Sequence, residues 1–274
     1  MAINKKYIIG IDIGGSKINT VIFSGGKVLK SAKISTPKKS QKEFLEKLET
    51  LVKKLISDAG SKKIIGVGCG VVGTLNLEKG VILNAPNLRY LNNFNIKNWL
   101  EKRFSCKVKI DNDARCFIRG EYMLGAGRGY KNIVGITLGT GIGGGIIIDG
   151  KMFYGASGAA GELGHMIIDC VKDFEFLTVK RVRKFKFSKI AIKEFKKNFG
   201  IGLANIINIL DPEIIIIGGA AGNMVMRFLS EAKRIMNKLV VSPKSRKNVK
   251  IITGKLGENA GAIGAAALFY ENKN

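Results

Sequence analysis

The chain has 274 residues, of which 46 are Lys or Arg and 21 are Asp or Glu, so its formal net charge is +25. An apolar fraction of 46% supports a folded core and excludes a disordered chain, and no apolar run approaches the 18 residues of a membrane span. A positive balance favours anionic ligands, but a lysine-rich solvated surface is the simpler explanation of this charge. We therefore expect no specific nucleic-acid partner and no membrane partner.

The first half of the chain opens with three predicted strands and an amphipathic helix. The helix, over residues 41–58, places seven apolar side chains on one face. A glycine-rich loop over residues 68–73 is expected after the fourth strand, with a hairpin beyond it. The predicted elements are strands 7–13, 18–23, 27–34, 64–69 and 108–110, and helices 41–58 and 114–124.

The second half repeats this order, with a glycine-rich turn between its first two strands. In its long helix, Gly200 and Gly202 are candidate interruptions. The predicted elements are strands 132–138, 145–149, 152–154, 214–217 and 249–252, and helices 188–209, 223–238 and 259–270.

The shared order predicts a duplicated α/β fold of two lobes with a central cleft. We expect an N-terminal lobe over residues 1–114, joined by the C-terminal helix 259–272, and a C-terminal lobe over residues 115–258. Ligands of such sheets bind beyond the carboxyl ends of the strands.

Two segments, 68–73 and 139–144, match the pattern GxGxxG, but neither opens a helix, so NAD binding is not expected. No GxxxxGK[ST] pattern occurs either. Two segments, residues 12–17 and 139–143, are predicted turns between two strands and are rich in small residues. Turns without Cβ atoms let backbone N–H groups approach phosphate oxygens, so this pair favours a polyphosphate ligand.

Seven motifs in chain order carry a resemblance to the ROK (repressor, open reading frame, kinase) family of actin-like, ribonuclease H-like sugar kinases. The resemblance implies ATP- and Mg²⁺-dependent phosphorylation of a sugar, with glucose or a related hexose as the default substrate, and a homodimer. No DNA-binding segment precedes the first strand, which resembles the kinase branch. The motifs are IGIDIGGSKI (9–18), GVGCGVVGTL (66–75), NAPNL (84–88), IDNDARC (110–116), LGTGIGGGII (138–147), AAGELGH (159–165) and IIIIGGAAG (214–222).

The resemblance also implies roles for individual residues. Asp113 falls on the general base that accepts the proton of the sugar hydroxyl, and Asp12 on the group that positions Mg²⁺ and phosphate through water. Expected sugar-site residues are Asn112, Asp113, Glu162, His165, Gly73 and Asn87. Expected phosphate-loop residues are Gly14, Gly15, Ser16 and Lys17 in the first turn and Gly139, Thr140 and Gly141 in the second, with Gly218, Gly219 and Gly222 flanking adenosine.

The chain departs from the family after His165. Many members continue with CxCGxxGCxE, whose cysteines bind zinc, whereas here only Cys170 follows, so we expect no zinc and no other protein-bound metal. Glu175 is the candidate for the sugar-binding Glu at that motif's end. The basic segment 180–197 makes polyphosphate an alternative donor. An N-acetylhexosamine kinase and a catalytically weak sugar- or nucleotide-binding protein are further alternatives.

The four cysteines, Cys69, Cys106, Cys116 and Cys170, show no CxxC spacing, and the N-terminus lacks a secretory signal pattern. We therefore expect reduced thiols and a cytoplasmic location.

Overall fold

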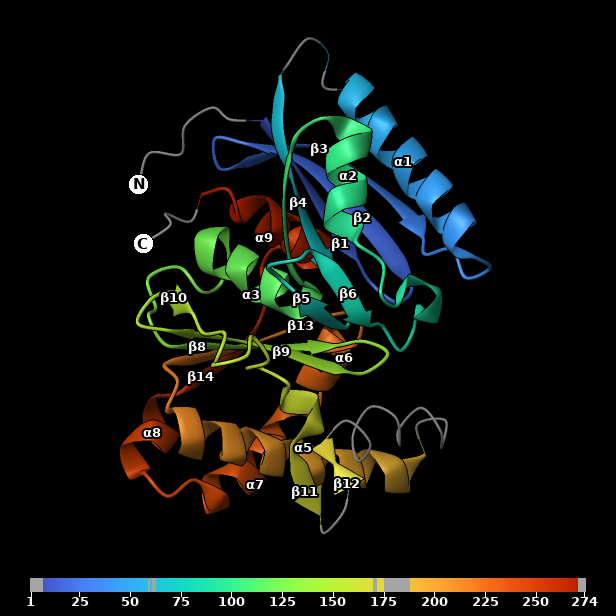
Figure 1. Cartoon of the computed structure of the whole chain (residues 1–274). Coiled ribbons are helices and arrows are strands. Elements are labelled where there is room, and N and C mark those ends of the chain that lie inside the picture. Colours follow the sequence, from blue (N-terminus) through green and yellow to red (C-terminus); the bar gives the residue numbers. More distant parts are fainter. Residues whose placement is uncertain (1–6, 59, 61–62, 170–171, 175–187, 271–274) are drawn as a thin grey trace. The chain divides into compact units, whose positions relative to one another are not determined.

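The computed structural model describes residues 7–58, 60, 63–169, 172–174 and 188–270 (Figure 1). The chain divides into two compact units, residues 1–125 with 256–274 and residues 126–255. Within the described part of the chain, no helix is both long and apolar enough to cross a bilayer.

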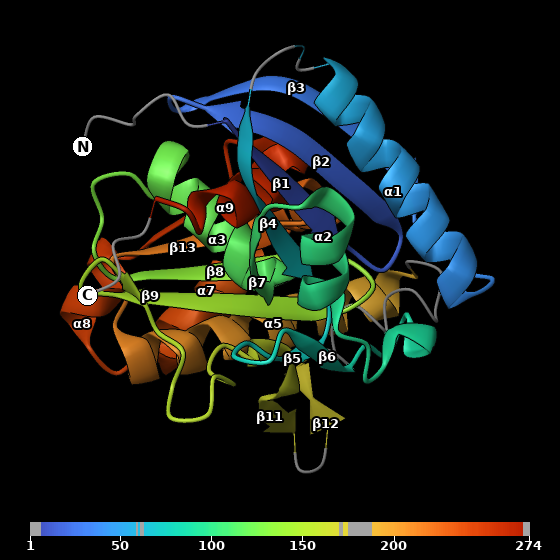
Figure 2. The same ribbon diagram turned by 45° about the horizontal axis from the view of Figure 1, so that its top comes forward.

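The first unit is built on a five-stranded sheet in the order β3-β2-β1-β4-β7. β1 is antiparallel to β2, and β2 to β3, whereas β1, β4 and β7 are parallel (Figure 2). The parallel strands therefore end at one edge of the sheet. The strands are β1 (Tyr7–Ile13), β2 (Lys17–Ser24), β3 (Lys27–Ser35), β4 (Ile64–Val71) and β7 (Lys107–Asn112); β5 (Thr74–Asn76) and β6 (Val81–Asn84) form a separate hairpin.

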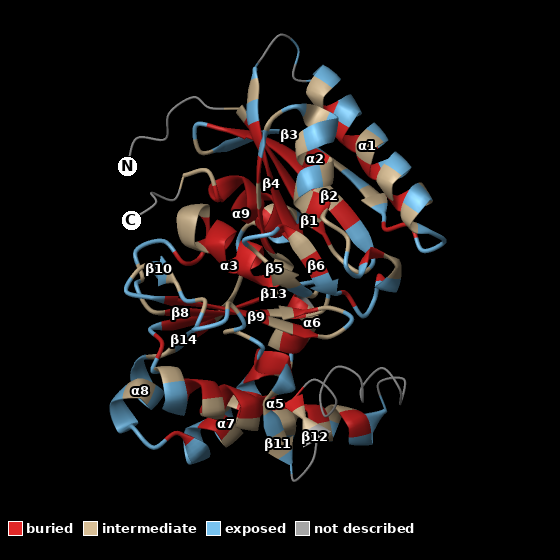
Figure 3. Ribbon diagram, in the orientation of Figure 1, coloured by how far each residue is buried: buried red, intermediate tan, exposed pale blue. Residues whose placement is uncertain are grey.

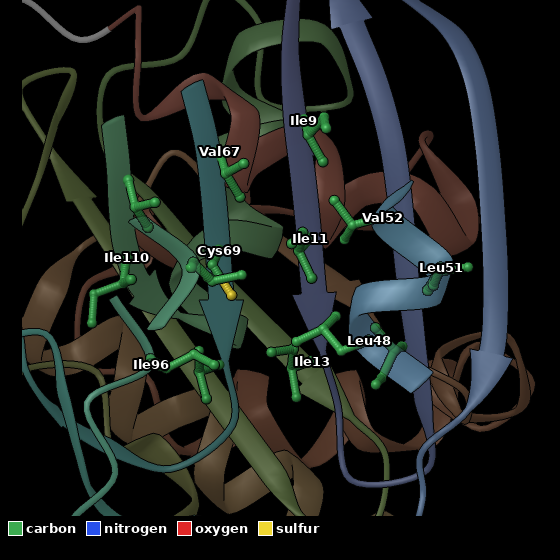
Figure 4. Packing of buried hydrophobic residues seen from close by; sticks show 14 of the residues in the cluster. Ile9, Ile11, Ile13, Leu48, Leu51, Val52, Val67, Cys69, Ile96 and Ile110 are labelled. Carbon is green, nitrogen blue, oxygen red and sulfur yellow. The ribbon is translucent and has the colours of Figure 1, made fainter. Parts of the chain in front are cut away.

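Helices cover both faces of this sheet. On one face, α1 (Gln41–Asp58) and α2 (Ile96–Phe104) pack their apolar stripes against isoleucine and valine side chains of β1, β4 and β7 (Figure 4). On the other face lie α9 (Ala260–Ala267), which packs on β1 and β4, and α3 (Asp113–Leu124), which packs on α9. Two 3₁₀ turns, η1 (Arg89–Leu91) and η4 (Gly257–Asn259), complete the unit.

Glycines bring α9 unusually close to its neighbours. A Cβ on Gly10 of β1 would lie 1.9 Å from the carbonyl oxygen of Ala262, and one on Gly68 of β4 would lie 1.9 Å from that of Ala265. Between the helices, a Cβ on Gly264 would lie 1.6 Å from the carbonyl oxygen of Cys116. This backbone-to-backbone packing places α3 in the first unit. The boundary thus follows Gly125, whereas the sequence led us to expect it after residue 114.

Substituting Gly264 by Ala tests this packing. Ala favours helix by about 1 kcal/mol over Gly, but the clash with the Cys116 carbonyl should dominate, so we expect a net loss of at least about 2 kcal/mol in unfolding free energy. Urea denaturation measures it. Gly222→Ala is the control, because its Cβ would lie at an ordinary contact distance of 3.6 Å from the Ile217 carbonyl oxygen. Equal midpoints for Gly264→Ala and wild type would contradict the close packing.

The second unit repeats the topology, with a sheet in the order β10-β9-β8-β13-β14. β8 is antiparallel to β9, and β9 to β10, whereas β8, β13 and β14 are parallel. The same order in both units confirms the predicted duplicated α/β fold, and the central strands of both sheets are buried (Figure 3). The strands are β8 (Ile133–Leu138), β9 (Ile142–Ile148), β10 (Lys151–Met152), β13 (Ile214–Gly218) and β14 (Lys250–Thr253); β11 (Ile167–Asp169) and β12 (Lys172–Asp173) pair separately.

The helices of the second unit differ from the sequence prediction in three respects. α5 continues through Gly200 and Gly202 without interruption. The missing side chains leave space for the backbone of Ala232 in α7 and for the Phe174 ring to pack against the helix. The helix expected over 223–238 is two helices, and α8 was not predicted. The helices are α5 (Lys189–Leu210), α6 (Gly222–Met226), α7 (Leu229–Leu239) and α8 (Pro243–Asn248), with the 3₁₀ turn η2 (Leu163–His165).

Candidate active site

Two carboxylates mark the carboxyl edge of the first unit's sheet. Asp12 is the next-to-last residue of β1, and Asp113 begins α3 directly after β7. The Asp12 carboxyl group lies against the backbone of α9, where a Cβ on Gly261 would be 2.4 Å from Oδ2. Gly261 therefore makes room for this carboxyl group, a role that the sequence did not reveal.

The Asp12 carboxyl group is held in an environment that disfavours its charge. Although Asp12 keeps some exposed surface, burial of the carboxyl group, together with the nearby Asp113 carboxylate, raises the pKa of Asp12 from 3.8 to about 8. A cation or a donor group bound at this edge would relieve the repulsion between the two acids.

The backbone before Asp113 is fixed by its neighbour Asn112. The Asn112 side chain caps α3 by accepting hydrogen bonds from the amides of Ala114 (2.9 Å) and Arg115 (3.2 Å). Its Nδ2 donates to the carbonyl oxygen of Gly73 at 3.1 Å. Asn112 thereby ties the end of β7 to the segment after β4, which places Gly73 beside the candidate base.

Gly73 has a φ of +105°, a conformation that favours glycine. A Cβ there would lie 2.1 Å from the carbonyl oxygen of Asn84. The segment after β4 is therefore packed against the end of β6, three residues before the predicted sugar-site residue Asn87.

The turn between β1 and β2 holds the predicted first phosphate loop, Gly14–Lys17. The Gly14 amide donates to the Lys17 carbonyl at 3.0 Å, and Thr36 Oγ1 donates to the Gly14 carbonyl at 2.8 Å. Lys38 Nζ donates to the carbonyl oxygens of Gly15 and Asn87. The loop is thus fastened to the residues after β3, and Gly15 lies beside Asn87.

Lys17, at the end of this loop, faces an acidic partner. Its Nζ lies 3.2 Å from Oε1 of Glu258, which also pairs with Lys33 at 2.6 Å. Sequence reasoning missed Glu258 because nothing in the local pattern links it to a loop 241 positions away.

In the second unit, two predicted nucleotide loops meet at the carboxyl ends of β8 and β13. The turn at residues 139–141 is closed by a hydrogen bond from the Gly139 amide to the Gly141 carbonyl at 2.9 Å. The Ala221 amide donates to the Leu138 carbonyl at 2.9 Å, and Gly219, with φ +81°, packs on the Leu138 backbone. Gly218, Gly219 and Gly222 are therefore neighbours of the turn that contains Thr140.

Glu162, which directly precedes η2, and His165, the last residue of η2, are both exposed. Glycine fixes this turn on β9, since a Cβ on Gly164 would lie 2.4 Å from the carbonyl oxygen of Ile142. His165 Nδ1 lies 3.8 Å from Oδ2 of Asp173. Both predicted sugar-site side chains are accessible to a ligand from the surface of this unit.

The structure groups no three described His, Cys, Asp or Glu residues in a way that suits a metal ion. Cys170 and Glu175 lie outside the described residues. Burial raises the thiol pKa values of Cys69 and Cys116, so neither is a reactive thiolate at neutral pH.

Comparison with known proteins identifies the family. The ROK family model matches residues 8–184 and 178–272. The chain belongs to the ROK family. The two matched segments of this ROK protein overlap at residues 178–184. This overlap follows the segment after His165 in which the sequence lacks the CxCGxxGCxE motif.

Relatives of this ROK protein include both enzymes and a regulator. The N-acetyl-D-glucosamine kinase of Mannheimia succiniciproducens is 31% identical over 310 residues, covering 96% of this chain and 99% of that protein. The xylose repressor of Caldicellulosiruptor bescii is 29% identical over 310 residues, covering 95% of this chain and 77% of the repressor. Similarity across the chain therefore does not by itself separate catalysis from regulation.

Among solved structures, a ROK family glucokinase from Streptomyces griseus, in complex with glucose and AMPPNP, superimposes with a TM-score of 0.81. The two chains are 26% identical, and the match covers 96% of this chain and 98% of the glucokinase. The likeness confirms the actin-like fold of this ROK protein.

Proposed function

We propose that this ROK protein is a sugar kinase that transfers the γ-phosphoryl group of ATP to a hydroxyl of glucose or a related hexose. The observation that carries the proposal is the pair of carboxylates Asp12 and Asp113 at the carboxyl edge of β1, β4 and β7, next to the glycine turn at residues 14–17. Similarity to a glucokinase and to an N-acetylglucosamine kinase supports it.

Asp113 is the general base of this proposal. The sugar hydroxyl oxygen forms a bond to the γ-phosphorus, the bond from phosphorus to the bridging oxygen of ADP breaks, and the hydroxyl proton passes to the Asp113 carboxylate. Capping by Asn112 and the start of α3 hold this carboxylate at a defined place, as positioning catalysis requires.

The residues at Asp12 fit a magnesium ion bound with the nucleotide. A cation beside Asp12 would relieve the repulsion from Asp113 that contributes to the raised pKa of Asp12, and Mg²⁺ retains waters through which Asp12 would hold it. Bound there, Mg²⁺ would neutralise phosphate charge. Asp12 itself accepts hydrogen bonds from that hydration shell and so orients it.

We assign the remaining predicted residues by their chemistry. Exposed Glu162 accepts hydrogen bonds from sugar hydroxyls, and His165 offers one donor and one acceptor. Asn112 has one further Nδ2 hydrogen for the sugar, and Gly73 and Asn87 border its site. The small turns at residues 14–17 and 139–141 offer backbone N–H groups to phosphate oxygens, and Gly218, Gly219 and Gly222 flank adenosine.

A coupled assay of ADP release over a panel of about a dozen sugars tests the proposal. We expect turnover with Mg-ATP and glucose or a related hexose, and none without sugar. A parallel arm replaces ATP by polyphosphate and follows sugar phosphate; turnover there that falls steeply with salt would favour the polyphosphate donor. The strongest response to an N-acetylhexosamine would reassign the substrate within the same mechanism.

A sugar- or nucleotide-binding protein without turnover is the alternative from another class, and similarity to a xylose repressor favours it. Calorimetric titration with the same sugars separates the two. Sugar binding at micromolar to millimolar affinity without ADP release, in the presence of Mg-ATP, would replace the kinase proposal. Light scattering on the same sample measures the oligomeric state, for which we propose a homodimer.

A further inference from the structure

A buried ionic cluster is formed by residues that flank Asp113 in the chain. Asp111 Oδ1 accepts a hydrogen bond from Arg115 Nε at 2.7 Å, and Asp111 Oδ2 accepts one from Arg119 Nη2 at 2.7 Å. The side chains of Asp111, Arg115 and Arg119 are 1%, 7% and 3% exposed. We refer to these three residues as the α3 ion cluster, to which the sequence assigned no role.

Stability alone does not account for the α3 ion cluster. Every residue of α3 from Ala114 to Glu121 is buried. In such surroundings the removal of apolar side chains from water is favourable, whereas an ion pair must recover the large penalty of removing its charges from water. Apolar replacements of similar volume are often neutral or stabilising, so stability gives little reason for these buried charges.

The geometry of the cluster relates it to the candidate base. Asp111 lies in β7, while Arg115 and Arg119 lie in the first and second turns of α3, so the cluster joins strand and helix on either side of Asp113. Asp111 Oδ1 also accepts a hydrogen bond from the backbone N–H of Asn112 at 2.8 Å. Together with the Asn112 cap, these bonds fix the backbone that carries Asp113.

We propose that Asp111, Arg115 and Arg119 are positioning residues that set the place and direction of the Asp113 carboxylate. This inference rests on the proposed kinase function. A general base must meet the reacting hydroxyl at hydrogen-bond distance, and a displacement of about 1 Å lowers turnover about 10²-fold.

Arg119→Met tests the cluster, because it removes one charge, keeps an apolar stem and leaves Asp111 paired with Arg115. We expect kcat to fall about 10- to 100-fold while the KM values for sugar and ATP stay within about 2-fold. The matched control is Arg103→Met, which breaks the exposed ion pair with Glu49 on α1 and should leave kcat unchanged.

A double-mutant cycle with Asp113→Asn separates positioning from loss of folded protein. If the cluster acts through Asp113, Arg119→Met has no further effect on the residual kcat of Asp113→Asn. An equal fall in both backgrounds, or an unchanged kcat in the wild-type background, would overturn the inference. Should Asp113→Asn itself retain wild-type turnover, the assignment of the base fails, and this inference fails with it. The proposed kinase function fails separately, if the wild-type protein releases no ADP with any sugar of the panel.

Arg115→Lys provides the same readout if Arg119→Met does not fold. It keeps the positive charge and most of the length but loses the Nε–H donor that Asp111 accepts. A normal kcat in a folded Arg115→Lys protein would likewise count against positioning.

Discussion

Replacing Asp113 by Asn should lower kcat about 10²- to 10⁴-fold while the protein remains folded. The amide is nearly isosteric and can begin α3 in the same place, but it cannot accept the hydroxyl proton. The measurement is kcat with saturating Mg-ATP and sugar, accompanied by a thermal unfolding curve.

Asp58→Asn is the matched control, since it makes the same chemical change at the exposed last residue of α1. It should leave turnover and unfolding unaltered. Retention of turnover within a few-fold in Asp113→Asn would reject the assignment of the base, whatever substrate the sugar panel identifies.

Prediction from sequence succeeded where a local pattern was strong. The bounds of β1 and α1 agree with the residue ranges predicted, because a run of β-branched residues and a stripe of seven apolar side chains each specify one structure. α8 is six residues of PKSRKN with no apolar face, so periodicity could not indicate it. Its Ser-Pro start, with Ser242 as cap, was the available signal.

The candidate site illustrates a different limit. A motif singled out Asp113, but its proximity to Asp12 depends on the order β1-β4-β7, which sequence order does not specify. Arg115 and Arg119 would ordinarily be assigned to a solvated helix face, because arginine is almost never fully buried without a partner. Their burial depends on the tertiary packing of α3, whose backbone approaches α9 closely at Gly264.

Asp12→Asn should have opposite effects on activity and on stability. We expect turnover to fall at least about 10²-fold, because the amide loses the charge that orients hydrated Mg²⁺. In metal-free protein, the same change should raise the unfolding free energy at pH 8.5 by several kcal/mol, since each unit of pKa shift corresponds to about 1.4 kcal/mol. The gain arises because the buried carboxyl group of wild-type Asp12 is charged there.

The sign of the pH dependence follows from the pKa of Asp12, which is about 8 in the folded chain against 3.8 as its ordinary value. Between these values the folded protein binds a proton that the unfolded chain releases, so the Asp12 contribution lowers stability progressively as pH rises through this window. Asn binds no proton, and the stability difference between variant and wild type should therefore be small at pH 4 and largest above pH 8.

Urea denaturation at pH 4.5, 6.5 and 8.5 with EDTA measures this difference, and Asp58→Asn should show none. A difference that is independent of pH would mean that the pKa of Asp12 is not raised, and the burial of its carboxyl group and its repulsion by Asp113 would have to be abandoned as the explanation.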